Sequence, residues 1–249
     1  MNWFPDVSPA TLILLVLVAL VAGLSRGFSG FGAALIFVPL SGALVGPKLA
    51  APVLAIIDGI FASYLIPSSL RLANRRDIGL MLAGALTGVP LGSFILAHYS
   101  QLTLRWLIAG MASAMLVLLI SGWRYHGKPH ALATICVGAI SGLFSGIAQI
   151  GGPPVVSYWM GTDTGHQQLR ANIILFFGAM TVVTLTNYYW SGLIHLSILK
   201  LSALAGPAYG LGTWAGAKMF RFASPTVFRT VSLLLIAFAV VTSLPIFNW

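Results

Sequence analysis

Long apolar segments separated by short polar connections fill almost the whole chain. Several of them approach the roughly 17 to 25 residues that a helix needs to cross about 30 Å of hydrocarbon. Only 7% of the 249 residues are charged, against about 25% in soluble domains. We therefore expect an all-α, polytopic integral membrane protein, in which no stretch is left over for a soluble domain.

The expected segments form two sets of five around a polar linker at residues 122–130. We expect residues 1–121 and 131–249 to be two repeats within a single membrane domain. In each repeat a hairpin rich in glycine and proline precedes three transmembrane helices. The expected segments are residues 10–24, 30–45, 50–69, 78–98 and 102–121 in the first half, and 131–145, 152–161, 169–191, 196–217 and 225–244 in the second.

A motif at residues 142–158, GLFSGIAQIGGPPVVSY, interrupts the apolar pattern. Inside a helix each glycine is unfavourable by about 1 kcal/mol and each proline by about 3 kcal/mol relative to alanine. Phe144-Ser145-Gly146 repeats Phe28-Ser29-Gly30 at a spacing of 116 residues, so we expect non-helical backbone at both places. After the second break, residues 152–161 would give only about 15 Å of helix, which predicts a half-helix that starts at Pro153 near the membrane midplane.

Further matches at a spacing of 124 residues support an internal duplication. Gly88, Gly92, Ser100 and Arg105 recur as Gly212, Gly216, Ser224 and Arg229.

The distribution of basic residues predicts the topology. If each glycine-rich region is a hairpin, formed either by a re-entrant loop or by two short crossings, nine basic residues lie on one side and three on the other. If each glycine-rich region is instead one continuous crossing, the count is six on each side. The positive-inside rule therefore favours hairpins, inverted repeats and both termini outside. We interpret the net charge of +9 as a consequence of this topology and not as a surface that binds nucleic acid. The nine are Arg71, Arg75, Arg76, Arg124, Lys128, Arg170, Lys218, Arg221 and Arg229, and the three are Lys48, Arg105 and Lys200.

Half-helix amino termini in inverted repeats commonly face anionic substrates, because their free N–H groups and the helix dipole attract negative charge. We expect the two glycine-rich regions to hold the two ends of a small anion, with Ser29, Ser145 and Gln149 as additional donors. An alternative is that the glycines only allow close helix packing. The expected substrate contacts from these regions are Phe28, Ser29, Gly30 and Gly32, and Ser145, Gly146, Gln149, Gly151, Gly152 and Pro153.

Three further polar residues stand in or beside apolar segments. Arg26 is either an intramembrane cation that attracts the anion or, if the hairpin makes two full crossings, a cytoplasmic turn residue. Asp58, in the middle of a segment, is either an ion-pair partner of Arg26 or a proton-coupling group. Asn172, early in the segment after the second hairpin, is a further candidate for substrate binding.

The sequence argues against an enzyme. It contains no glutamate, its four aspartates are far apart, and its histidines show no metal-ligand spacing. We expect no catalytic residue, cofactor or metal. The expected partners are a small anionic substrate and the lipid bilayer, with no nucleic acid, and both a monomer and a homodimer stay open.

The chain resembles the sulfite exporter TauE/SafE family of membrane transporters over nearly its whole length. The resemblance rests on residues 27–32, GFSGFG, on residues 145–154, SGIAQIGGPP, and on the small-residue helices at residues 84–92 and 206–216. It implies transport of sulfite, a sulfonate or another organosulfur anion across a cytoplasmic membrane, by a multi-pass secondary transporter that uses alternating access. The alternatives are an anion channel of the same architecture and a membrane assembly subunit that transports nothing.

Overall fold

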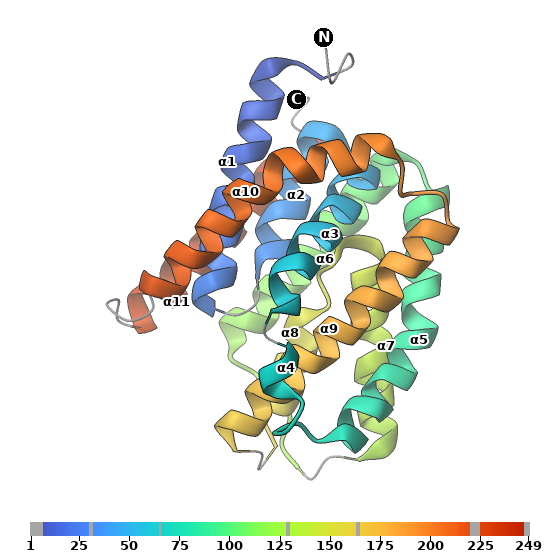
Figure 1. Ribbon diagram of the computed structural model, residues 1–249, viewed down its shortest axis with the longest axis vertical. Helices are drawn as coiled ribbons and strands as arrows, with labels where there is room; N and C mark the ends of the chain where they lie inside the picture. Colours follow the sequence, from blue (N-terminus) through green and yellow to red (C-terminus); the bar gives the residue numbers. More distant parts are fainter. Residues whose placement is uncertain are drawn as a thin grey trace.

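The computed structural model describes residues 7–29, 32–64, 66–127, 130–162, 165–219 and 225–246, and all regular structure in these ranges is helical. The expected all-α class is confirmed (Figure 1). Most helices begin and end within a few residues of the expected segments, but the segment expected at residues 50–69 is divided into two helices, α3 and α4. The helices are α1 (Pro9–Ser29), α2 (Ala33–Val45), α3 (Pro47–Ser63), α4 (Ile66–Ser69), α5 (Arg75–His98), α6 (Gln101–Ser121), α7 (Ala131–Ala148), α8 (Gly152–Trp159), α9 (His166–Trp190), α10 (Leu196–Met219) and α11 (Pro225–Ser243).

Within the described ranges, five helices are long and apolar enough to cross a membrane, namely α1, α5, α6, α7 and α9. The 13 residues of α2 and the 8 residues of α8 correspond to only about 20 Å and 12 Å of helix. Both fall short of the roughly 30 Å of hydrocarbon. The second member of each hairpin is therefore too short for a full crossing.

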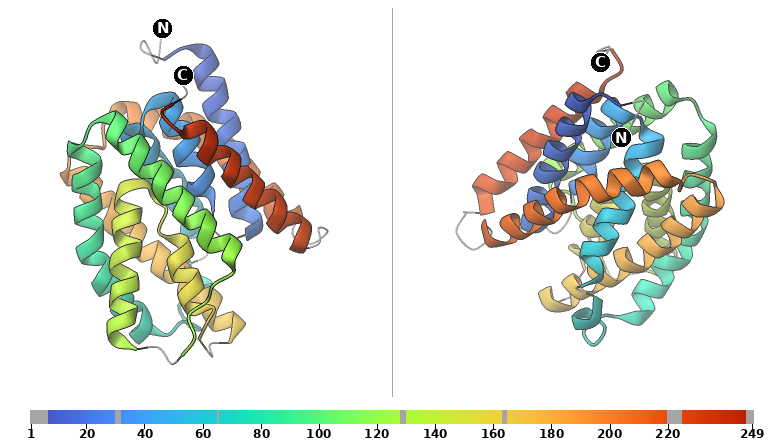
Figure 2. Two further views of the ribbon diagram at one scale, coloured as in Figure 1. Left: turned by 180° about the vertical axis from the view of Figure 1, so that it is seen from behind. Right: turned by 45° about the horizontal axis from the view of Figure 1, so that its top comes forward.

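The two hairpins enter the molecule from opposite ends (Figures 1 and 2). In Figure 1, α1 descends from the top and α2 returns upwards, whereas α7 rises from the bottom and α8 turns back. The amide of Tyr125, in the linker before α7, donates to the carbonyl oxygen of Ser157 in α8 at 3.1 Å. The hydroxyls of Thr134, in the first turn of α7, and Tyr158, near the end of α8, are hydrogen bonded at 2.7 Å, so α8 ends close to where α7 begins.

The backbone breaks are shorter than the sequence motifs suggested. Non-helical backbone was expected at Phe144, Ser145 and Gly146, and this expectation is wrong, because α7 continues to Ala148. In the same way α1 stays helical through Ser29. Only residues 149–151 separate α7 from α8. The half-helix that the sequence predicted is α8, which begins at Gly152, one residue before Pro153.

Packing between helices explains why these glycines remain helical. α5 packs along α7, and α1 packs along α10, so the first helix of each hairpin lies against a helix of the other half. A methyl group at Gly142 would overlap the backbone of Ala85, and one at Gly146 would overlap the carbonyl oxygen of Val89. The low helix propensity of glycine is offset by the van der Waals packing between the two helices, whose backbones can approach closely only where there is no side chain. The other glycines whose Cβ atoms would meet backbone across these two contacts are Gly23, Gly27, Gly84, Gly88, Gly92, Gly138, Gly212 and Gly216.

Candidate substrate site

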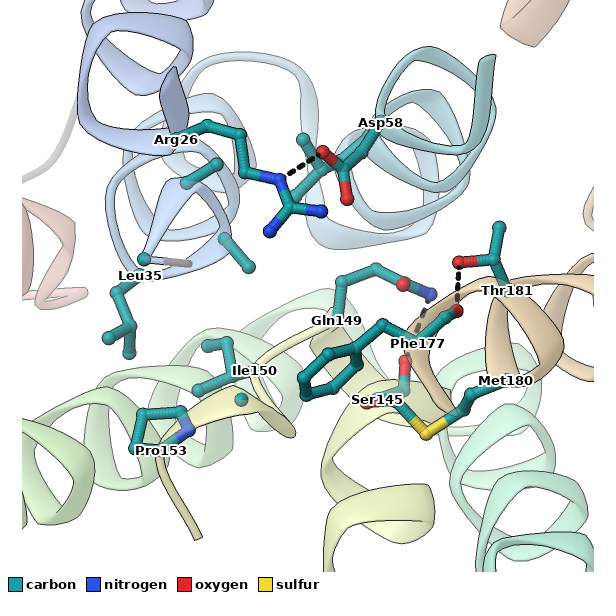
Figure 3. Close-up of a pocket in the computed structure, with 15 residues that line it drawn as sticks. Arg26, Leu35, Asp58, Ser145, Gln149, Ile150, Pro153, Phe177, Met180 and Thr181 are labelled. Atoms are coloured by element: carbon teal, nitrogen blue, oxygen red, sulfur yellow. Dashed lines mark hydrogen bonds and ion pairs between the residues drawn. The ribbon is translucent and has the colours of Figure 1, made fainter. Parts of the chain in front are cut away.

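A cavity of about 60 Å³ lies where the breaks of the two hairpins meet (Figure 3). A single water needs about 10 to 15 Å³ measured in this way, so the cavity has room for a solute of a few non-hydrogen atoms. Residues from α1, α2, α3, α7, α8 and α9 form its wall. They are Arg26, Gly32, Ala33, Ala34, Leu35, Leu54, Asp58, Ser145, Gln149, Ile150, Gly152, Pro153, Phe177, Met180 and Thr181.

The amino-terminal turns of α2 and α8 both border this cavity. Gly32 precedes α2 in the left-handed region, with φ of 97°, a conformation that favours glycine. Neither helix has a side-chain cap at its amino end, and the first N–H groups of a helix have no partner within it. Because prolines 153 and 154 carry no N–H, α8 offers the amide of Gly152 and the positive end of its dipole.

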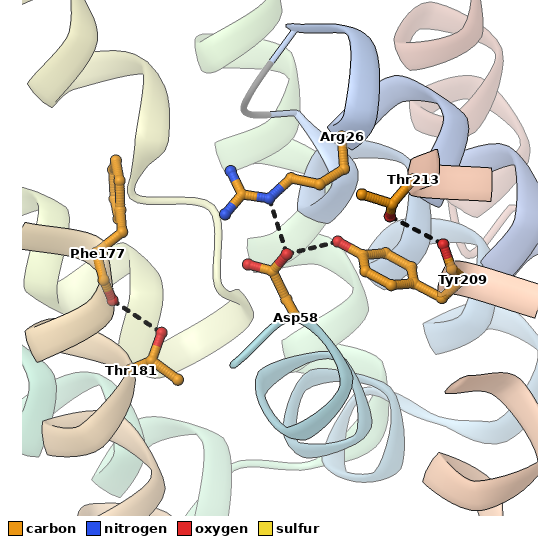
Figure 4. A network of polar contacts seen from close by, with 6 residues as sticks. All are labelled: Arg26, Asp58, Phe177, Thr181, Tyr209 and Thr213. Atoms are coloured by element: carbon orange, nitrogen blue, oxygen red, sulfur yellow. Dashed lines mark hydrogen bonds and ion pairs between the residues drawn. The ribbon is translucent and has the colours of Figure 1, made fainter. Parts of the chain in front are cut away.

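An ion pair forms the opposite wall of the cavity. Arg26 Nε donates to Asp58 Oδ1 at 2.8 Å, and the Tyr209 hydroxyl donates to the same oxygen at 2.6 Å (Figure 4). The other guanidinium nitrogens of Arg26 point towards the segment that contains Gln149 (Figure 3). The sequence left two alternatives open for each of these charged residues. The structure shows Arg26 inside the helical bundle and Asp58 as its ion-pair partner.

The second hairpin contributes Ser145 and Gln149. The side chain of Ser145 is buried, with 1% exposure, and its hydroxyl has no hydrogen-bond partner in the described structure. Gln149 has φ of 60°, and among the described residues it alone combines positive φ with a side chain. Such strain persists where the surrounding structure fixes it and is frequent at functional sites. The Gln149 side-chain amide donates to the carbonyl oxygen of Ser145 at 3.1 Å.

The structure brings together seven of the residues that the sequence singled out. They are Arg26, Gly32, Asp58, Ser145, Gln149, Gly152 and Pro153.

The other candidates do not line the cavity or lie outside the described residues. Phe28 is buried at the end of α1, and Gly146 packs on α5. Gly151 faces α7, where its carbonyl oxygen accepts a hydrogen bond from Ser141 at 2.8 Å. Gly30 lies outside the described residues, as does the side chain of Ser29.

Asn172 also lies away from the cavity wall. Its side-chain oxygen accepts a hydrogen bond from the backbone amide of Asn74 at 2.8 Å, which joins the beginnings of α9 and α5. This contact ties two helices together and leaves Asn172 without a place in the lining of the cavity.

Sequence reasoning did not identify Tyr209 or the residues of α9 that face the cavity. Tyr209 is 151 residues from Asp58. In the sequence it is only a single hydroxyl group on an apolar segment, which does not indicate a contact with Asp58. Phe177 and Met180 are ordinary side chains for a transmembrane helix, so no local pattern distinguishes them. Thr181 donates to the carbonyl oxygen of Phe177 at 2.8 Å, as threonine commonly does inside helices.

Comparisons with known proteins agree with this architecture. Residues 15–243 match the family described as Sulfite exporter TauE/SafE. The chain is 26% identical over 236 residues to a probable sulfite/organosulfonate exporter TauE from Cupriavidus necator, with 88% of this chain and 90% of that protein covered. No solved structure matches the chain. Because the family match spans most of the chain, the protein belongs to the sulfite exporter TauE/SafE family, whose members are membrane transporters and not enzymes.

Proposed function

We propose that the protein is a secondary transporter that carries a small sulfur-containing anion, such as sulfite or a sulfonate, across the cell membrane by alternating access. One observation carries the proposal: the amino-terminal turns of α2 and α8 and the side chain of Arg26 line the same cavity. The relative from Cupriavidus necator, named as a probable sulfite/organosulfonate exporter, supports this class of substrate.

Three groups on the cavity wall would bind the anion. The Arg26 guanidinium supplies charge-assisted hydrogen bonds, which are roughly twice as strong as neutral ones. The Ser145 hydroxyl, which has no partner in the described structure, gains an acceptor when the anion arrives. The amide of Gly152 and the two helix dipoles stabilise the remaining negative charge.

We further infer that the chain consists of two inverted repeats. The hairpin α1–α2 corresponds to α7–α8, and α3, α5 and α6 correspond to α9, α10 and α11. This correspondence pairs the α1–α10 contact with the α7–α5 contact, which are the two most extensive helix contacts among the described residues. The Arg26–Asp58–Tyr209 network joins the halves, since Tyr209 belongs to α10. Rocking of one half against the other would open the cavity to either side of the membrane.

Transport into proteoliposomes tests the proposal. Sulfite or methanesulfonate uptake should saturate with concentration and should be stimulated by substrate on the far side. Gly152→Leu places a side chain in the cavity and should abolish uptake without loss of folded protein. Gly110→Leu is the matched control, because the space around Gly110 is open, and it should transport normally.

Two results would count against this function. Uptake by Gly152→Leu at the wild-type rate would show that the cavity is not the substrate site. Flux that neither saturates nor responds to substrate on the far side would favour an anion channel over a carrier.

A further inference from the structure

The side-chain charges on the cavity wall cancel each other. Among the described residues that line it, Arg26 and Asp58 are the ones with ionisable side chains, and they neutralise each other as an ion pair at 2.8 Å. What remains is the positive end of two helix dipoles, each equivalent to about half an elementary charge. The cavity wall therefore has a net positive charge of at most about one unit.

On the basis of the proposed function, we propose that Asp58 sets the charge of the transported anion. The site takes a singly charged oxyanion, such as a sulfonate or hydrogensulfite, and discriminates against doubly charged anions such as sulfate. A monoanion is matched by the two helix termini. A dianion would bring a second negative charge into a partly buried site where Asp58 already neutralises the charge of the guanidinium, and uncompensated buried charge is unfavourable.

A second observation concerns Ser145, which lines the cavity together with the ion pair. The Ser145 hydroxyl is buried on the wall of the cavity and has no hydrogen-bond partner in the described structure. Buried polar groups normally have hydrogen-bond partners, so the Ser145 hydroxyl lacks an acceptor in the described structure. An oxygen atom of a bound oxyanion would be that acceptor, and no further charged side chain is needed.

The carboxylate of Asp58 is held in position from two sides. Arg26 in α1 and Tyr209 in α10 both donate to the Oδ1 atom, at 2.8 Å and 2.6 Å (Figure 4). The negative charge therefore stays beside the cavity when an anion enters. Tyr209 acts here as a positioning residue, since it holds Asp58 and does not line the cavity itself.

Three solutes of nearly equal size and tetrahedral shape separate charge from fit. Dimethyl sulfone is neutral, methanesulfonate is singly charged and sulfate is doubly charged. Their dissociation constants for the purified protein can be measured by isothermal titration calorimetry and by thermal shift. The wild-type protein should bind methanesulfonate most tightly.

The informative variant is Asp58→Asn, which removes the charge and keeps an oxygen that can accept from Tyr209. The ratio of the sulfate to the methanesulfonate dissociation constant should fall by about tenfold or more, because one charge at a distance of a few Å has an effect of this size at the dielectric typical of proteins. Asp77→Asn is the matched control. Asp77 lies in the first turn of α5 and away from the cavity wall, and its loss should leave the ratio unchanged.

A charge-compensation pair keeps the proposal testable if Asp58→Asn alone does not fold. Arg26→Gln leaves Asp58 to cancel the helix dipoles, so methanesulfonate binding should be lost. The double variant Arg26→Gln/Asp58→Asn restores the net charge, and it should recover measurable methanesulfonate binding and again prefer methanesulfonate to sulfate.

The outcomes are distinct. An unchanged ratio in Asp58→Asn, or a double variant that binds no better than Arg26→Gln, would overturn the role of Asp58. Failure of the wild-type protein to bind or transport any sulfur oxyanion would overturn the proposed function itself.

Discussion

The hydroxyl of Tyr188 donates a hydrogen bond to the carbonyl oxygen of Gly146 at 2.9 Å. Tyr188 belongs to α9 and is completely buried, whereas Gly146 lies in the last turn of α7. The carbonyl oxygens in the last turn of a helix lack intrahelical partners, and Tyr188 supplies one. Tyr188 thereby fixes the end of α7, from which the backbone turns into the cavity at Gln149.

Tyr188→Phe should lower the free energy of unfolding by about 1 to 3 kcal/mol, the usual result of leaving a buried carbonyl oxygen unsatisfied. Thermal or chemical unfolding of the detergent-solubilised protein measures the change. Tyr189→Phe is the matched control, because the neighbouring Tyr189 is 69% exposed and should tolerate the substitution. Equal stability of the two variants would show that the hydrogen bond has no structural role.

Ser145→Ala should separate stability from binding. The Ser145 hydroxyl has no partner in the described structure, so its removal should leave the free protein as stable as before or slightly more stable. The same change should weaken methanesulfonate binding by about tenfold, since a hydrogen bond to a charged group contributes roughly 1.5 to 3 kcal/mol. Calorimetric titration of the variant gives the affinity.

Ser41→Ala serves as the control for that experiment. Ser41 is also buried without a partner among the described residues, but it is not part of the cavity wall. Its replacement should leave the affinity unchanged. If Ser145→Ala and Ser41→Ala bound the anion equally well, Ser145 would not be a ligand.

The α5–α7 contact should not tolerate even one methyl group. A Cβ at Gly88 would overlap the carbonyl oxygen of Ala139, so Gly88→Ala must push the helices apart. We expect a loss of about 1 to 3 kcal/mol, as for other overpacked sites. Gly110→Ala, in open space on α6, should instead be neutral or stabilising by up to about 1 kcal/mol, because alanine favours helix. The unfolding midpoint of Gly88→Ala should fall below that of the wild type, whereas that of Gly110→Ala should not fall; equal midpoints for the two variants would contradict the packing argument.

Much of the fold could be predicted because its signals are local. Segment lengths and the prolines after Gly152 are each visible within a few residues. The extent of the breaks could not be predicted, because Gly146 packs against Val89 and Gly92 of α5, which lie more than fifty residues earlier in the chain. Long-range packing overrode local propensity there.

The candidate site also contains residues that could be predicted from local sequence and residues that could not. Arg26 and Asp58 could be singled out because charge inside an apolar segment is unusual. Tyr209 and Phe177 could not, because an aromatic residue on a transmembrane helix acquires a role only through the neighbours that the fold gives it. Asn172 is polar as well, but its side-chain oxygen accepts a hydrogen bond from the backbone of Asn74, and it does not line the cavity.

The orientation of the protein in the membrane gives a last prediction. Basic residues should face the cytoplasm, which places the α6–α7 linker inside and the α5–α6 connection outside. Tyr99 and Trp123 lie just beyond the two ends of α6, a candidate membrane span, and both are exposed. After replacement of Cys136 by alanine, Tyr99→Cys should react with a membrane-impermeant maleimide in intact cells, and Trp123→Cys should react only in inside-out vesicles. The opposite pattern would place the basic end outside, whereas labelling of both cysteines from one side would show that α6 does not cross the membrane.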